Sequence, residues 1–113
     1  MTRSQRPIDA AVGAYLAAVA RSGIPVSFGI VFGSHAAGTP DVWSDIDVVV
    51  VSARFDGPRA RSDIALLWRT AAQIDSRIEP IPCGLTQWRE DDSSAVIEMA
   101  RRHGHRVAVP AAA

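Results

Sequence analysis

The sequence predicts a single α/β domain with a sheet of three to four strands. In two long segments, apolar residues recur at three- and four-residue spacing, which is typical of amphipathic helices. Between the helices lie runs of β-branched residues, above all Val48–Val51, which are typical of buried strands. The length of 113 residues, with 48% hydrophobic and 21% charged residues, is that of one globular domain over residues 1–113.

Residues 8–20 are predicted to form the first helix, because their apolar positions share one helical stripe. Pro7 suits the first turn, where its missing amide hydrogen is no loss. Gly23 and Pro25 end the helix. The residues of the stripe are Ile8, Val12, Tyr15, Leu16 and Val19.

Two strands are predicted next, over residues 26–32 and 45–52. The run of four valines in the second strand indicates a central strand that is buried on both faces. A second long helix is predicted over residues 60–74. Its apolar side includes Trp68, which is therefore expected in the core. The other residues of that side are Ile64, Leu67, Ala71 and Ile74.

Residues 77–83 are predicted to form a third strand. Pro80 and Pro82 lack amide hydrogens two residues apart, so both gaps fall on the same side of the strand. This pattern favours a strand at the edge of the sheet.

A last helix is predicted over residues 94–102, with Asp92 or Ser93 as its N-terminal cap. Residues 105–109 are expected to form a short final strand. The core then extends over about residues 8–109, and the tail 110–113 is expected to be frayed.

The charge balance excludes some classes of function. Basic and acidic residues number 12 each, so strong electrostatic binding of nucleic acid is not expected. The single cysteine, Cys83, allows no internal disulfide, which fits a reducing compartment. Neither a run of about 20 apolar residues nor a signal peptide is visible, so we expect a soluble, cytoplasmic protein without membrane contact.

Two carboxylates stand at the start of the predicted central strand. Residues i and i+2 of a strand point to the same face, so Asp45 and Asp47 lie with their Cα atoms about 7 Å apart on one side. Such carboxylates repel each other, and Mg²⁺, which prefers oxygen ligands, relieves the repulsion. Two metal ions are a common device for in-line phosphoryl transfer. Taken alone, the pair equally fits a turn cap beside a solvated strand end.

Gly33 and Ser34 follow the strand predicted over residues 26–32. Free backbone amides at the start of a short helix attract phosphate, glycine permits its close approach, and a serine hydroxyl adds a donor. An ordinary strand-to-helix turn has the same residues. The combination of an anion-binding turn after one strand and paired carboxylates on the next favours a site for a metal-bound nucleotide.

The stretch Phe32-Gly33-Ser34, Gly38 and Ser44-Asp45-Ile46-Asp47-Val48 resembles the signature of the nucleotidyltransferase superfamily that includes DNA polymerase beta. The chain is most similar to the minimal nucleotidyltransferases, single-domain proteins that are often encoded beside a helical HEPN partner. The resemblance implies the nucleotidyltransferase fold, a mixed sheet with helices mainly on one face. It also implies that ATP or another NTP is the substrate and that Mg²⁺, as two ions, is the cofactor.

The resemblance also implies the roles of individual residues. Gly33 and Ser34 would bind the distal phosphates, and Asp45 and Asp47 would bind the nucleotide through its metal ions. A third acidic residue on a later strand, matched by Glu79, would complete the metal site and help deprotonate the acceptor hydroxyl. Asp45, Asp47 and Glu79 are thus the expected catalytic and metal-binding residues.

Two observations leave alternatives open. Glu79 also fits a solvated carboxylate on an edge strand that pairs with Arg77, and Asp75 is a second candidate for the third acid. Many family members carry a basic residue before the second glycine of the loop, where this chain has Ala37. His35 is a partial substitute, and the departure affects phosphate affinity more than metal binding.

The resemblance implies a Mg²⁺-dependent enzyme that transfers AMP from ATP to a hydroxyl of a HEPN partner, as the antitoxin of a toxin–antitoxin pair. The alternative is a non-catalytic antitoxin that neutralises its partner by occlusion, which Ala37 and the short chain favour. A small-molecule transferase is less consistent, because the similar aminoglycoside enzymes carry an added helical domain. Homo- and hetero-oligomers both stay open.

Overall fold

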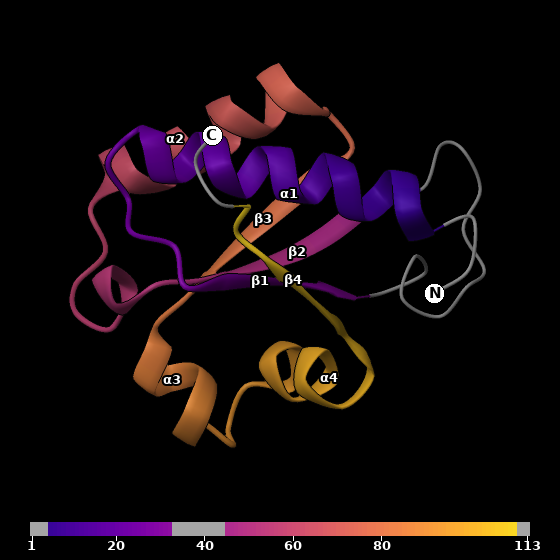
Figure 1. Ribbon diagram of the computed structural model, residues 1–113. Coiled ribbons are helices and arrows are strands. Elements are labelled where there is room, and N and C mark those ends of the chain that lie inside the picture. Colours follow the sequence, from indigo (N-terminus) through magenta and orange to yellow (C-terminus); the bar gives the residue numbers. More distant parts are fainter. Residues whose placement is uncertain (1–4, 33–44, 111–113) are drawn as a thin grey trace.

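The computed structural model describes residues 5–32 and 45–110, which form a four-stranded sheet between layers of helices (Figure 1). The strand order is β3-β2-β1-β4. β1 is antiparallel to β2 and β4, whereas β2 and β3 are parallel, so the sheet is mixed as expected. The strands are β1 (Phe28–Phe32), β2 (Ile46–Val51), β3 (Ile78–Cys83) and β4 (His105–Ala108).

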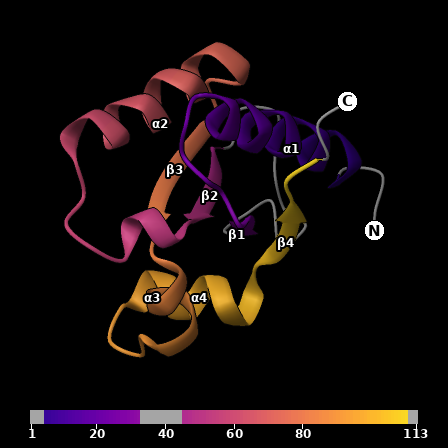
Figure 2. The same ribbon diagram turned by 60° about the vertical axis from the view of Figure 1, so that its left-hand side comes forward.

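Helices cover both faces of the sheet (Figures 1 and 2). The two long helices, α1 (Gln5–Arg21) and α2 (Arg61–Ile74), lie on one face. The shorter α3 (Leu85–Glu90) and α4 (Ala95–His103) lie on the other. The expectation of helices mainly on one face therefore holds for the long helices, while the short pair covers the second face. None of the helices described is long and apolar enough to cross a membrane.

The valine run of β2 contributes to two separate cores. Val48 and Val50 pack with α1 and α2 residues, whereas Val49 and Val51 pack on the opposite face with residues of α3 and α4. All four side chains are fully buried. This confirms the prediction of a central strand, because side chains alternate across the sheet and both faces are covered.

β3 lies at the edge of the sheet, as its prolines predicted. The Ile46 amide donates to the Arg77 carbonyl and the Ser52 amide to the Cys83 carbonyl, so the odd-numbered residues of β3 face β2. Backbone groups alternate along a strand, and Pro80 and Pro82 therefore face away from the sheet. Their missing amides remove no ladder bond and leave an outer edge poor in donors.

Trp68 is not in the core, which corrects the expectation from the helical pattern. Its side chain is 50% exposed, while Leu67 and Ala71 are buried. Successive residues of a helix are turned by about 100°, and the buried stripe of α2 is too narrow to include Trp68. Ile74, at the last position of the helix, is also 40% exposed.

The N-terminal cap of α4 is Ser94 rather than Asp92 or Ser93. Its hydroxyl accepts a hydrogen bond from the Ile97 amide at 3.3 Å. Ser93 instead donates to Asp91 through both its amide, at 2.8 Å, and its hydroxyl, at 2.7 Å. The carboxylate of Asp91 thus organises the turn that precedes the helix.

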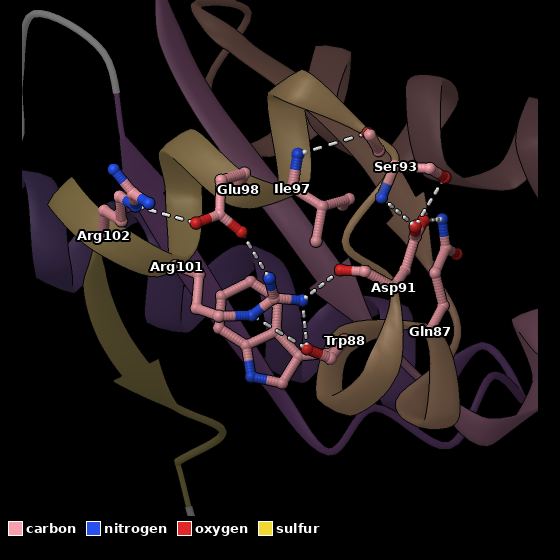
Figure 3. Close-up of polar contacts among 9 residues, drawn as sticks. Gln87, Trp88, Asp91, Ser93, Ile97, Glu98, Arg101 and Arg102 are labelled. Atoms are coloured by element: carbon pink, nitrogen blue, oxygen red, sulfur yellow. Dashed lines mark hydrogen bonds and ion pairs between the residues drawn. The ribbon is translucent and has the colours of Figure 1, made fainter.

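Arg101 ties α4 to α3 (Figure 3). Its guanidinium donates to the carbonyl of Trp88, and to the carbonyl of Asp91 at 2.9 Å. It also pairs with Glu98 at 2.9 Å and lies 5.3 Å from the centre of the Trp88 ring. One cation therefore satisfies carbonyl groups at the end of α3, where a helix leaves them without partners.

The sequence does not predict α3, because the N-terminus of this helix is capped from a distant segment. The Asp56 carboxylate, which follows a 3-10 turn at Ala53–Phe55, accepts from the amides of Thr86 at 2.9 Å and Gln87 at 3.2 Å. Such a contact between residues 30 positions apart leaves no local pattern in the sequence.

Candidate functional site

Phe32, Asp47 and Glu79 form a row across three neighbouring strands. Asp47 pairs with Phe32 of β1 on one side and with Glu79 of β3 on the other. Paired residues point to the same face of a sheet. The next row on that face is Ile30, Val49 and Ile81, which belong to or pack against the core under α3 and α4. The two carboxylates therefore lie just beyond the end of this core.

This row lies at the end of the sheet where β1 finishes and both β2 and β3 begin. Antiparallel and parallel pairings meet here, because β2 returns beside β1 while α2 brings the chain back to start β3. Asp45 directly precedes β2 and is exposed, whereas Asp47 and Glu79 are half-buried. Acids that are 32 positions apart in sequence are thus held on adjacent strands, about 5 Å apart at their backbones.

The electrostatics of the site centre on Glu79. Partial burial, followed by the nearby negative charges of Asp45 and Asp47, raises the pKa of the Glu79 carboxyl above its ordinary value. A protonated Glu79 can share a hydrogen bond with either aspartate, which acts in the same direction. Both aspartates are therefore close enough to Glu79 to raise the pKa of its carboxyl group.

A divalent cation fits the chemistry of this donor set. The three side chains offer only carboxylate oxygens, the ligands that Mg²⁺ prefers. Burial and then repulsion by the two aspartates raise the pKa of Glu79, and a bound cation would remove the repulsion. Over residues 5–32 and 45–110, no three His, Cys, Asp or Glu side chains are already gathered as a metal site.

The other predicted residues are placed as follows. Gly33 and Ser34, together with His35 and Ala37, lie in 33–44, outside the described residues. Arg77 pairs with Asp75, at 2.7 Å between Nη2 and Oδ2, instead of with Glu79. The hydrogen bond to Asp75 raises the pKa of the Arg77 guanidinium. Asp75 thus accepts hydrogen bonds within the turn between α2 and β3. Of the two candidates for the third acid, Glu79 is the one that lies beside Asp47.

An open hollow of about 600 Å³ lies at the opposite end of β2. Val51, at the far end of β2, is four residues from Asp47, so the hollow lies beyond a point about 13 Å along the strand from the acidic row. Its polar groups are engaged with one another, as when Arg59 donates to Gln87 at 2.6 Å. We therefore place the candidate site at the acidic row. The hollow is lined by Phe55, Asp56, Gly57, Arg59, Gln87, Asp91 and Ser93.

The position of Phe32 beside Asp47 was not anticipated from the sequence. Its aromatic side chain is buried and closes the core next to the carboxylates. The only sequence signal is the place of Phe32 before Gly33, because the register of β1 against β2 is fixed by tertiary pairing.

Comparison with known proteins bears on the same segment. The sequence model of the family described as "Nucleotidyltransferase domain" matches residues 18–83, more than half of the chain. This range includes β1, β2, α2 and β3 and all five predicted site residues. No curated protein matches the chain.

Two solved structures share the fold. A candidate nucleotidyltransferase from Sulfolobus solfataricus aligns with a TM-score of 0.60 and 22% identity, over 79% of this chain and 78% of its own. A toxin–antitoxin structure with AMP-PNP aligns with a TM-score of 0.56 and 22% identity, over 83% of this chain and 70% of its own. At this identity the likeness concerns the fold: an α/β arrangement with a mixed four-stranded sheet.

Proposed function

Because the chain belongs to the nucleotidyltransferase domain family, we propose that it transfers AMP from ATP to a hydroxyl group of a partner protein. The observation that carries the proposal is the placement of Glu79 beside Asp47, with Asp45 close enough to affect the ionisation of Glu79. Paired carboxylates next to a third acid suit phosphoryl transfer better than any other group of described residues.

Asp45, Asp47 and Glu79 would hold Mg²⁺, and Gly33 and Ser34 would bind the distal phosphates through their amides and hydroxyl. Bound Mg²⁺ would neutralise phosphate charge and polarise the α-phosphate. The half-buried Glu79 would orient the acceptor and take the proton from its hydroxyl. The acceptor oxygen then bonds to the α-phosphorus, the bond between the α- and β-phosphates breaks, and pyrophosphate leaves.

The partner is proposed to be a HEPN-type protein, with this chain as the antitoxin. Support comes from the similar toxin–antitoxin structure with AMP-PNP. The resemblance of the Gly33–Val48 segment to the minimal nucleotidyltransferases points the same way. The absence of a basic residue at Ala37 favours a second reading, in which the chain neutralises its partner by occlusion alone.

The test of catalysis separates nucleotide binding from transfer. Calorimetry with AMP-PNP and Mg²⁺ should show binding to the wild type and loss of binding, by at least about 30-fold, in Asp47→Asn. Asp92→Asn, an exposed aspartate between α3 and α4, is the matched control and should bind normally. Equal affinity of all three proteins would reject the assigned site.

Transfer is then measured with ATP labelled at the α-phosphate and the protein encoded beside this chain. Label should appear on that protein with the wild type and fall by at least about 100-fold with Asp47→Asn. Neutralisation of the partner by an Asp45→Ala, Asp47→Ala protein, without any labelling by the wild type, would instead establish occlusion.

A further inference from the structure

Trp68 stands on the outward face of α2, away from the sheet. The indole is 50% exposed, although the adjacent Leu67 is fully buried. A single exposed apolar residue is common on protein surfaces, but a tryptophan loses much favourable burial in this position. The residues around Trp68 therefore decide whether its exposed indole belongs to a binding surface.

Small residues flank the indole on the same face of the helix. Ala65 and Ala72 lie three positions before and four positions after Trp68, and both are exposed. Side chains at these spacings lie above one another on a helix. The methyl groups leave the indole as the tallest apolar feature of a flat surface, which is the shape of an interface anchor.

Two arginines share this face, and neither has an acidic partner among the residues that the structure describes. Arg61 lies one turn before Ala65, and Arg69 lies one turn after it. The acidic residues nearby are already engaged. Asp63 is buried and pairs with Arg54 at 2.8 Å, and Asp75 pairs with Arg77 at 2.7 Å. The α2 face, defined as Arg61, Ala65, Trp68, Arg69 and Ala72, thus combines an apolar centre with uncompensated positive charge.

We propose that the α2 face docks an acidic surface of a partner protein, with Trp68 as its anchor. Tryptophan and arginine are the residues most enriched among those that dominate binding energy. Carboxylates on the partner would complement Arg61 and Arg69 and fix its register.

Other occupants match the face less well. In a two-fold dimer the same surface meets itself, so Arg61 and Arg69 would approach like charges of the second copy. Nucleic acid would find only two cations here, on a chain whose basic and acidic residues balance at 12 each. An acidic protein surface satisfies the charges and covers the apolar centre together.

Docking at the α2 face leaves the candidate site open. α2 covers the face of the sheet that holds Val48 and Val50, whereas Asp47 and Glu79 point to the opposite face. A partner held at α2 can therefore be bound without covering the carboxylates. The α2 face is thus separate from the place where an acceptor hydroxyl would reach Glu79, and the proposal goes beyond the proposed function. Its test measures binding alone, so an inactive site would leave it intact.

The first experiment identifies what touches the α2 face. The photo-cross-linking residue benzoylphenylalanine is placed at Ala72 of the full chain, in cells of the organism that encodes it. The matched control carries the same residue at Ala95, an exposed alanine of α4. Irradiation should link one protein through position 72 and not through position 95. Linkage to nucleic acid or to a second copy of the chain, or no linkage, would overturn the proposal.

The second experiment measures affinity for the purified cross-linked protein. Trp68→Ala should weaken binding by at least about 30-fold, and Arg61→Glu with Arg69→Glu by about 10-fold or more, with recovery when partner carboxylates are changed to lysine. Met99→Ala, which is 52% exposed on α4, should stay within about two-fold of wild type. Equal affinity of the Trp68→Ala and Met99→Ala proteins, both with wild-type melting temperatures, would refute the anchor.

Discussion

Glu79 stands directly beside Asp47 across the parallel strands β2 and β3. Partial burial and the neighbouring carboxylates raise the pKa of Glu79, so the folded chain holds a proton there more tightly than the unfolded chain does. The same proximity that suits the row to a cation is therefore a cost to the fold when no cation is bound.

Replacement of Glu79 by glutamine should stabilise the metal-free protein at neutral pH. The folded-state pKa is raised, so the favourable contribution of protonated Glu79 is complete below its unfolded pKa and is lost as pH rises through the folded value. Wild type and Glu79→Gln should thus be equally stable near pH 3. At pH 7 the variant should gain less than about 1 kcal/mol, because water screens a half-exposed group.

Urea unfolding as a function of pH, with Glu90→Gln as the control for an exposed glutamate of α3, measures this difference. Mg²⁺ should raise the Tm of the wild type more than that of Glu79→Gln. A variant that is less stable than wild type at pH 7 would contradict repulsion within the row.

Asp56 should make the fold sensitive to acid in the opposite sense. Desolvation acts to raise its pKa, but hydrogen bonds from the amides of Thr86, Gln87 and Leu85 together lower it below the ordinary 3.8. A lowered folded-state pKa gives a contribution that is present above the unfolded pKa and lost as pH falls through the folded value.

Asp56→Ala should therefore melt at a lower temperature than wild type at pH 7, with the two curves converging as pH falls below 3.8. Asp92→Ala, at an exposed position of the same layer, should follow the wild type at every pH. A constant gap between Asp56→Ala and wild type down to pH 2 would show that the carboxylate charge is not responsible.

Gly84 should tolerate no side chain, because Asp56 lies against it. A Cβ atom at Gly84 would stand 2.8 Å from the Asp56 Cα, which is backbone and cannot move aside. We expect Gly84→Ala to lose about 2 kcal/mol of unfolding free energy through overpacking. A Cβ at Gly57 would meet nothing within 4 Å, so Gly57→Ala should stay within about 0.5 kcal/mol. Equal unfolding free energies of the two variants would count against the close approach.

Arg101 and Arg102 are adjacent in the sequence but make different contacts, so their replacements should differ in their effect on stability. Arg101 satisfies the carbonyls of Trp88 and Asp91, so its replacement by alanine should cost about 2 kcal/mol. Arg102 is 71% exposed and pairs only with Glu98 among described residues, so Arg102→Ala should cost less than about 0.5 kcal/mol. Denaturant titration of both variants measures their unfolding free energies. A loss of equal size in the two would mean that the carbonyl contacts of Arg101 are not stabilising.

The sequence predicted the elements whose signal is local. The β-branched run of β2, the helical stripe of α1 and the prolines of β3 all lay where expected, since periodicity and missing donors can be seen in a single segment. α3 was not predicted, because Asp56, which caps it, lies 30 positions away in the sequence. Trp68 was misplaced because periodicity does not set the width of the buried side.

At the candidate site, the sequence predicted positions within single segments better than contacts between strands. The spacing of Asp45 and Asp47 placed both on one side of β2, but only tertiary register brings Glu79 and Phe32 to Asp47. The family signature predicted that Glu79 joins Asp45 and Asp47, but it did not predict that Phe32 lies beside Asp47. The described residues add the raised pKa of that carboxyl, which no local pattern encodes.

The pairing of Phe28 with Ala108 has a consequence for biogenesis. On the ribosome, β1 emerges long before β4, so one flank of a strongly apolar strand stays uncovered while some 75 further residues are made. A nascent chain stalled before residue 105 would present an open template for self-association. We therefore expect that deletion of β4 yields inclusion bodies rather than a smaller folded protein.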